Sequence, residues 1–214
     1  MIPDTELAGV TAAHARLVAD LADLTDSQAR QTSLLPDWSV GHVLTHIARN
    51  ADGLTHMVEE AGRGVIGDQY PGGMAQRNGD IEAGAPRSAA ELRADVTTSA
   101  ARLEAAWSSL SVAQWDAQCR AGTGQVLALS ELPYRRWREV VIHHSDLGLA
   151  FTPDDWPEDF VGVELRRQLM RFRTSQPMGL TELPPAALAL APRARVAWLL
   201  GRARPEGLPE VMFG

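Results

Sequence analysis

The chain has 214 residues, 45% of them hydrophobic, and a formal net charge of −7. This length fits one large domain, or one ordinary domain with a small appendage. The acidic balance excludes a basic surface for nucleic acid or an anionic membrane. Cys119 is the single cysteine, which excludes an internal disulfide and favours a reducing compartment. With neither a signal peptide nor an apolar run of about twenty residues, we expect a cytoplasmic monomer without a membrane or nucleic-acid partner.

Apolar residues recur at three- and four-residue steps, which predicts amphipathic helices rather than strands. Ser39 and Ser88 each stand where a helix cap is expected, directly before an apolar stripe. Between Gly62 and Pro86 the chain is rich in turn residues, which predicts a long functional or mobile loop. The predicted long helices run from Asp4 to a break at Thr25, from Val40 to about Ala61, from Ala89 to about Leu110, and from Leu129 or Ser130 to about Gly148.

Four helices joined by longer connections predict a bundle. The connection from Trp115 to Gly124 can hold a short extended piece, and the clearest boundary is Thr152 to Pro157. We therefore expect a helix bundle in residues 1–152 and a small C-terminal α/β domain in residues 153–214. The fold class is mainly α, and the elements expected in the appendage are a helix from Glu158 to Arg173, one or two short strands between Leu180 and Leu190, and a helix from Ala194 to Arg204.

Two of the predicted helices carry side chains that bind metals. His42 and His46 lie on the second long helix, and Glu139, His143 and His144 lie on the fourth. Glu139 and His143 are four residues apart and share one face, whereas His144 is turned away by about 100°. We choose His46, Glu139 and His143, with His42 as the alternative. Two nitrogens and one oxygen suit zinc, and three protein ligands leave a fourth position for water or substrate.

The same residues have simpler interpretations. Glu139 and His143 could form an exposed helix pair that contributes a few tenths of a kcal/mol. Against this, the apolar run Val140-Val141-Ile142 beside them favours a buried face, where an unpartnered carboxylate is costly. Asp146, three residues after His143, could orient that imidazole. The pattern favours the other interpretation of Asp146, an acid on the surface at the end of the helix.

Several arginines are candidates to bind a carboxylate substrate bidentately, although most are expected to be solvated charges. Cys119 stands in a connection without a neighbouring histidine, so we interpret it as a bystander rather than a nucleophile. The sequence has no phosphate loop, dinucleotide fingerprint or glycine-flanked nucleophilic serine. The candidate arginines are Arg77, Arg135, Arg136, Arg138, Arg193, Arg195 and Arg202.

Three segments carry a family resemblance. They are residues 36–50 (PDWSVGHVLTHIARN), 71–82 (PGGMAQRNGDIE) and 138–147 (REVVIHHSDL). Together they resemble the mycothiol-dependent maleylpyruvate isomerases, which belong to the DinB-like superfamily of metal-binding four-helix bundles. The resemblance covers roughly residues 1–150. The first and third segments are shared across mycothiol-linked bundle proteins, whereas the second is more particular to the isomerases.

The resemblance implies a DinB-like bundle with a divalent metal, zinc or another, on His46, Glu139 and His143, and mycothiol as a cofactor. It also implies a catalytic arginine from the C-terminal domain. The segment from Ala197 to Arg202 is similar to the matching stretch of the family and points to Arg202, with Arg193 or Arg195 as alternatives.

The implied activity is the conversion of maleylpyruvate, a small dicarboxylate, to fumarylpyruvate. Zinc holds the mycothiol sulfur as a thiolate, which adds to the cis double bond and makes it single. Rotation and elimination then give the trans product and return the thiol, while an arginine stabilises the enolate charge. Two alternatives remain, namely a mycothiol S-transferase or other thiol-dependent zinc enzyme of the same superfamily, and a non-catalytic bundle that senses a metal or a thiol.

Overall fold

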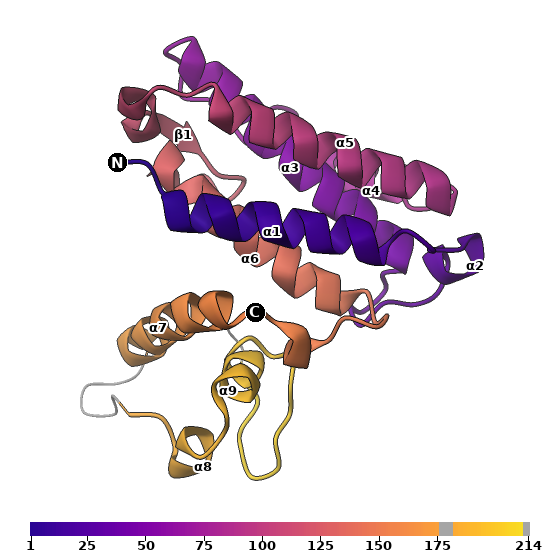
Figure 1. The fold of residues 1–214 in the computed structure, drawn as a ribbon, viewed down its shortest axis with the longest axis vertical. Coiled ribbons are helices and arrows are strands. Elements are labelled where there is room, and N and C mark those ends of the chain that lie inside the picture. The colour runs from indigo at the N-terminus through magenta and orange to yellow at the C-terminus, as the bar shows by residue number, and fades with distance from the viewer. Residues whose placement is uncertain (176–181, 212–214) are drawn as a thin grey trace. The chain divides into compact units, whose positions relative to one another are not determined.

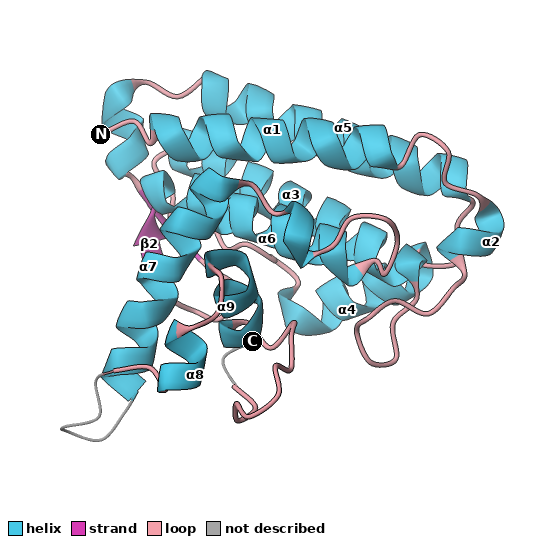
Figure 2. Cartoon of the chain, turned by 60° about the horizontal axis from the view of Figure 1, so that its bottom comes forward, coloured by secondary structure: helices cyan, strands magenta, loops and turns pink. Residues whose placement is uncertain are grey.

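A computed structural model describes residues 1–175 and 182–211 of the chain. Contacts divide it into two compact units, Met1–Leu149 and Ala150–Gly214. The expectation of a mainly helical protein is confirmed (Figure 2). The strands of the described residues are β1 (Gln118–Arg120) and β2 (Val126–Ala128), which pair antiparallel. Strand β1 lies in the connection where a short extended piece was expected, and β2 follows that connection. No helix in the described ranges has the length and apolarity that a membrane span requires.

The first unit is built on four long helices that lie side by side (Figure 1). Helix α1 contacts α5 and α6, and α3 also contacts α5 and α6, so the four helices close a bundle. The bounds of these helices are α1 Asp4–Asp20, α3 Val40–Gly62, α5 Ala89–Ser108 and α6 Leu132–Asp146.

The ends of the helices follow from local chemistry. The Ser39 hydroxyl accepts a hydrogen bond from the backbone N–H of His42 and caps α3, and Ser88 caps α5 in the same way. Pro133 lies in the first turn of α6, where a proline displaces no hydrogen bond. Helix α1 ends at Asp20, and the short helix α2 (Asp26–Ala29) begins after the capping residue Thr25.

The interior of the bundle is apolar and closely packed. Leu44 and Ile47 of α3 and Trp137 and Val140 of α6 are fully buried. Burying one such side chain contributes about 1.5–3 kcal/mol before the entropy cost of ordering it. Gly9 allows α1 to approach α6, since a Cβ atom there would lie 2.5 Å from Cε2 of Trp137. A larger residue at position 9 would therefore force α1 away from α6.

The prediction of a long loop between Gly62 and Pro86 is wrong in part, because this segment contains helix α4 (Gly73–Gly84). Three glycines in those twelve residues lower the intrinsic helix propensity, so the local sequence hides the helix. Tertiary packing compensates for this low propensity. Ile81 of α4 is buried, and α4 contacts α3. A long turn-rich segment can thus become helical when one apolar side chain anchors it.

The second unit contains a 3₁₀ turn and three α-helices in its described residues. The strands expected between Leu180 and Leu190 are wrong for residues 182–190, where the structure has helix α8; residues 176–181 lie outside the described ranges. Pro184 and Pro185 offer no backbone N–H to a sheet, and Pro185 fits the first turn of a helix. The described elements are η3 Pro153–Asp155, α7 Glu158–Ser175, α8 Pro185–Leu188 and α9 Pro192–Leu199, around a core of Leu183, Ala187, Trp198 and Leu199.

Candidate metal centre

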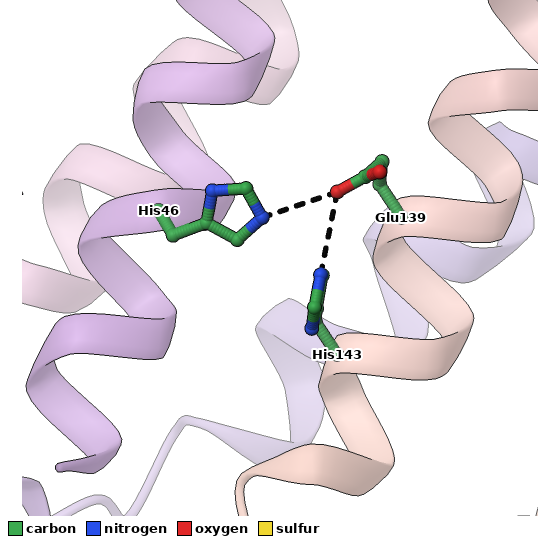
Figure 3. Close-up of side chains that lie close together, drawn as sticks. All are labelled: His46, Glu139 and His143. Carbon is green, nitrogen blue, oxygen red and sulfur yellow. Dashed lines mark hydrogen bonds and ion pairs between the residues drawn. The ribbon is translucent and has the colours of Figure 1, made fainter. Parts of the chain in front are cut away.

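Three ligand-type side chains meet between α3 and α6 (Figure 3). His46 projects from α3, while Glu139 and His143 project from successive turns of α6. Oε2 of Glu139 lies 3.1 Å from Nε2 of His46 and 3.4 Å from Nε2 of His143. The carboxylate therefore stands between the two imidazoles, as the facing argument from the sequence required.

The distances in this group fit a metal ion. Zinc bonds of about 2.0–2.1 Å in a tetrahedral site place neighbouring ligand atoms about 3.3 Å apart. The two distances from Glu139 Oε2 match that spacing, and all three ligand atoms lie within 4.8 Å of one another. The imidazole rings of His46 and His143 are 4.7 Å apart at 85°, so both nitrogen lone pairs can point to one centre. We conclude that these side chains could hold one divalent cation with room for a further ligand.

Burial and hydrogen bonding set the charges of the group. Burial alone would raise the pKa of Glu139, but hydrogen bonds from His143 and His46 outweigh it and hold that pKa well below its usual value. Burial lowers the pKa of His46, which favours the neutral imidazole that a metal needs. The pKa of His143 is raised, because Asp146 and Glu139 outweigh its burial. Thus two of the three ligands are held in their metal-binding protonation state at neutral pH.

Asp146 supports the group from behind His143. Its Oδ2 atom lies 2.9 Å from Nδ1 of His143, and its side chain is only 2% exposed. The interpretation of Asp146 as a surface acid is therefore wrong. The helix turns Asp146 inward at i+3 from His143, so the carboxylate accepts a hydrogen bond from the Nδ1–H group and leaves Nε2 as the nitrogen that binds an ion once its proton is lost.

Arg77 and Trp38 adjoin His46, and Tyr70 lies against the Arg77 guanidinium. Nη2 of Arg77 lies 2.7 Å from Nδ1 of His46, and the Arg77 guanidinium lies 6.0 Å from the ring centres of both Trp38 and Tyr70. The Trp38 ring is itself 5.6 Å from the His46 ring. Asp37 has a φ of 63°, a left-handed conformation that is uncommon outside glycine and directly precedes Trp38. Aspartate tolerates this conformation better than most residues, and here it belongs to the turn that leads into Trp38.

Sequence reasoning named Arg77 among the arginine candidates but missed Trp38 and Tyr70. The signal was present at Trp38, which lies inside the first of the three family segments. No periodicity places Tyr70 near His46, since Tyr70 precedes α4 and reaches the site only through tertiary packing.

The other histidine candidates lie outside the group. His42, the alternative ligand, is occupied by the cap of α3, with Nδ1 2.7 Å from the Ser39 hydroxyl and Nε2 3.3 Å from Glu82. His144 is buried on another side of α6, with Nε2 3.4 Å from Asp20. The one-residue rotation of an α-helix is enough to send His143 and His144 to different partners.

Arg202 lies just after α9 in the second unit, where Nη1 donates a hydrogen bond to the carbonyl oxygen of Leu200 at 2.9 Å. Its catalytic role stays a prediction. Cys119 is buried, and burial raises the pKa of its thiol to about 11, so it is protonated at neutral pH. This state agrees with the interpretation of Cys119 as a bystander.

The fold and the site define a four-helix bundle with a candidate metal centre between two of its helices. The sequence matches the family described as "Mycothiol maleylpyruvate isomerase N-terminal domain" over residues 10–148, and the chain belongs to this family.

Two solved structures share the fold of the whole chain. The crystal structure of a mycothiol-dependent maleylpyruvate isomerase superposes with a TM-score of 0.85 at 23% identity, over 99% of this chain and 96% of that one. The crystal structure of a histidine-to-alanine mutant of a mycothiol-dependent maleylpyruvate isomerase superposes with a TM-score of 0.82 at 23% identity, over 95% of this chain and 90% of that one. No curated protein matches the chain. At this identity the structures establish the fold, while the activity needs its own argument.

Proposed function

We propose that this protein is a zinc- and mycothiol-dependent cis-trans isomerase that converts maleylpyruvate to fumarylpyruvate. The observation that carries the proposal is the convergence of His46, Glu139 and His143 at metal-ligand spacing, in a chain of the mycothiol isomerase family. A zinc ion on these residues, together with mycothiol, would supply a thiolate at neutral pH as the nucleophile for the double bond.

Arg77 is the residue of the first unit best placed to bind the substrate. It lies against His46 and carries a fixed fork of N–H donors that matches a carboxylate. The substrate is a dianion, while the chain has a net charge of −7, so a local cation is needed to attract it. The aromatic rings of Trp38 and Tyr70 flank the guanidinium and restrict its movement.

The contact between Arg77 and His46 also links substrate binding to metal binding. A guanidinium only donates hydrogen bonds, so Nδ1 of His46 must accept and Nε2 must carry the proton. A metal on Nε2 needs the opposite tautomer, in which Nδ1 carries the proton and cannot accept from Arg77. Arg77 must therefore leave Nδ1 when an ion is present, and its donors become available to a substrate carboxylate.

Arg202 is proposed as a second carboxylate-binding arginine, on the family resemblance of the segment around it. The net reaction leaves the thiol unchanged, so the protein needs no nucleophile of its own. The protonated, buried Cys119 fits this requirement.

The direct test measures loss of maleylpyruvate by the zinc-loaded protein with and without mycothiol. We expect turnover only with both zinc and mycothiol, with fumarylpyruvate as the product. Equal rates with and without mycothiol would overturn the cofactor assignment. Accumulation of a stable mycothiol conjugate without trans product would instead identify an S-transferase.

A second test uses Arg77→Met beside the matched variant Arg135→Met. Arg135 lies on α6 and donates to Gln125 at 3.1 Å, away from the metal group. We expect Arg77→Met to raise KM for maleylpyruvate about tenfold or more, the effect of losing one charge-assisted contact. Zinc content should be unchanged or higher, because the competing contact on His46 is gone. A loss of zinc in Arg77→Met would show that Arg77 supports the metal rather than the substrate.

A further inference from the structure

A pocket of about 220 Å³ adjoins the metal centre through Arg77. It lies in the first unit between α3 and the segment of residues 69–80 that leads into α4. Arg77 belongs both to its lining and to the surroundings of His46, and Tyr70, which also lines it, lies against the Arg77 guanidinium. The volume is below the range of about 300–1,000 Å³ for drug-sized ligands. The pocket therefore suits a fragment, such as one ring, of a molecule that continues elsewhere.

The wall of this pocket is held in place by specific contacts. A Cβ atom on Gly53 would lie 2.7 Å from the backbone oxygen of Gln69, so only glycine lets this segment approach α3 so closely. The Gln69 amide oxygen accepts from the backbone N–H of Gly122 at 3.0 Å, and its amide nitrogen donates to the Tyr70 hydroxyl at 3.2 Å. Gln69 thus fixes Tyr70 as one side of the pocket.

Apart from Arg77, the charges in the pocket do not favour an anion. Arg49, which lines it, is engaged by two carboxylates, Asp52 at 2.9 Å and Asp95 at 2.6 Å. Asp52 also pairs with Arg102. The positive charge of Arg49 is therefore compensated within the wall. Asp80 adds a further carboxylate to the lining.

Two groups on α4 are placed to bind a neutral polar ligand. Asp80 and Gln76 are four residues apart, so they share one face of α4, and both line the pocket. Among the described residues, neither side chain has a hydrogen bond or ion pair. A carboxylate and an amide together accept from and donate to neighbouring hydroxyls, while Tyr70 offers an aromatic edge or face to the ring that carries them.

We propose that this pocket is the subsite for the polyhydroxylated part of the thiol cofactor. The inference rests on the proposed function, because it takes the thiol to be mycothiol, in which a cysteine-derived thiol is joined to sugar and inositol rings. With the sulfur at the metal centre, one ring occupies the pocket and its hydroxyls bind Asp80 and Gln76. The movement of Arg77 away from His46 on metal binding would alter the boundary between the two sites.

The experiment compares two thiols by isothermal titration calorimetry of the zinc-loaded protein. Mycothiol carries the rings, whereas N-acetylcysteine has the same thiol portion without them. The variants are Asp80→Asn, Gln76→Ala and the matched control Asp23→Asn, an exposed residue between α1 and α2. We expect each pocket variant to weaken mycothiol binding about tenfold, the usual effect of removing a hydrogen bond to a charged or polar group. Binding of N-acetylcysteine, zinc content and the control variant should stay at wild-type values.

Unchanged mycothiol binding in both pocket variants overturns the subsite, and so does an equal loss for both thiols. Wild-type protein that binds mycothiol no more tightly than N-acetylcysteine also overturns it. The test is independent of turnover. If the protein has no isomerase activity but the pocket variants still lose mycothiol binding selectively, the subsite stands and the isomerase assignment is wrong. If the protein is an active isomerase and the pocket variants bind mycothiol as the wild type does, the isomerase assignment stands and the subsite is wrong.

Discussion

Two of the clusters in the described bundle that join a histidine to a glutamate are built for different ends. In the metal cluster, His46, Glu139 and His143 aim three ligand atoms at one centre. In the second, which we call the arginine cluster, Nδ1 of His14 lies 2.7 Å from Glu104 and Nε2 accepts from Arg136 at 3.0 Å.

The difference lies in what supplies the positive charge. In the arginine cluster the guanidinium of Arg136 is fully buried and also donates to the Ile47 carbonyl oxygen at 2.7 Å and to Asn50 at 2.9 Å. Burial lowers the pKa of Arg136 to about 10, which still leaves it charged at neutral pH. None of the three residues of the metal cluster is an arginine or a lysine, and Glu139 is still 28% exposed. A histidine and a glutamate that meet in a bundle therefore indicate a metal only when no arginine fills the centre between them.

The largest expected effect is the loss of a ligand. Glu139→Ala should lower zinc affinity by more than about 100-fold and abolish turnover. About 100-fold is the largest loss usual for a residue that only hydrogen-bonds to a metal ligand, and a ligand itself should matter more. The helical circular dichroism signal should persist, because burial of apolar side chains provides most of the stability of the bundle.

The control for this change is Glu59→Ala, an exposed residue on α3. Zinc per chain and maleylpyruvate turnover are measured for both variants. Full zinc content in Glu139→Ala, or a collapse of its helical signal, would contradict the assignment of Glu139 as a ligand.

The arginine cluster should respond in stability rather than in metal binding. Arg136→Met removes the buried guanidinium that donates to the Ile47 carbonyl oxygen and to the side chains of Asn50 and His14, which should cost about 3 kcal/mol in the free energy of unfolding. Denaturant titration measures this loss, and Arg135→Met is the neighbouring control, expected to change stability by about 0.5 kcal/mol or less. The folded fraction of Arg136→Met should still take up zinc. A stable Arg136→Met protein that cannot bind zinc would contradict this expectation and show that the arginine cluster and the metal cluster act as one site.

A smaller change is expected when the support of a ligand is altered. Asp146→Asn replaces the carboxylate that accepts from Nδ1 of His143 with an amide, and should lower zinc affinity about 10- to 100-fold. Competition with a zinc-binding dye measures the affinity. Wild-type affinity in this variant would show that the contact between His143 and Asp146 only packs the helix end.

The smallest effect is a pH dependence specific to the arginine cluster. Burial lowers the pKa of His14, and the Arg136 charge adds to this. A folded-state pKa below the unfolded value of about 6.5 means that the unfolded chain binds more protons. The free energy of unfolding should then decrease as the pH falls below about 6.5.

The variant His14→Gln removes this titration. Its free energy of unfolding, measured by denaturant titration of the zinc-free protein between pH 7.5 and 5, should fall less steeply than that of the wild type. Parallel curves for the two proteins would show that His14 does not titrate in this range.

The sequence predicted the metal cluster because each of its parts is a local pattern. The four-residue spacing of Glu139 and His143 puts them on one helix face, and the apolar residues beside them show that the face is buried. His46 was chosen because its helix also has an inward stripe. Arg77 was only one of seven candidates, since nothing in a turn-rich segment tells where its side chains will go. Asp146 was assigned to the surface because a residue at a helix end has no periodicity beyond it.

By itself, the sequence determined which residues form the long helices, where the serine caps begin two of them, and which faces are apolar, because these features depend on neighbours within one or two turns. Only the tertiary structure decided that residues 73–84 form a helix, that Arg77 lies on His46, and that Arg136 fills the centre beside His14. These outcomes depend on side chains that are tens of residues apart in the chain, and their energies arise only when packing removes water and brings the partners within bonding distance.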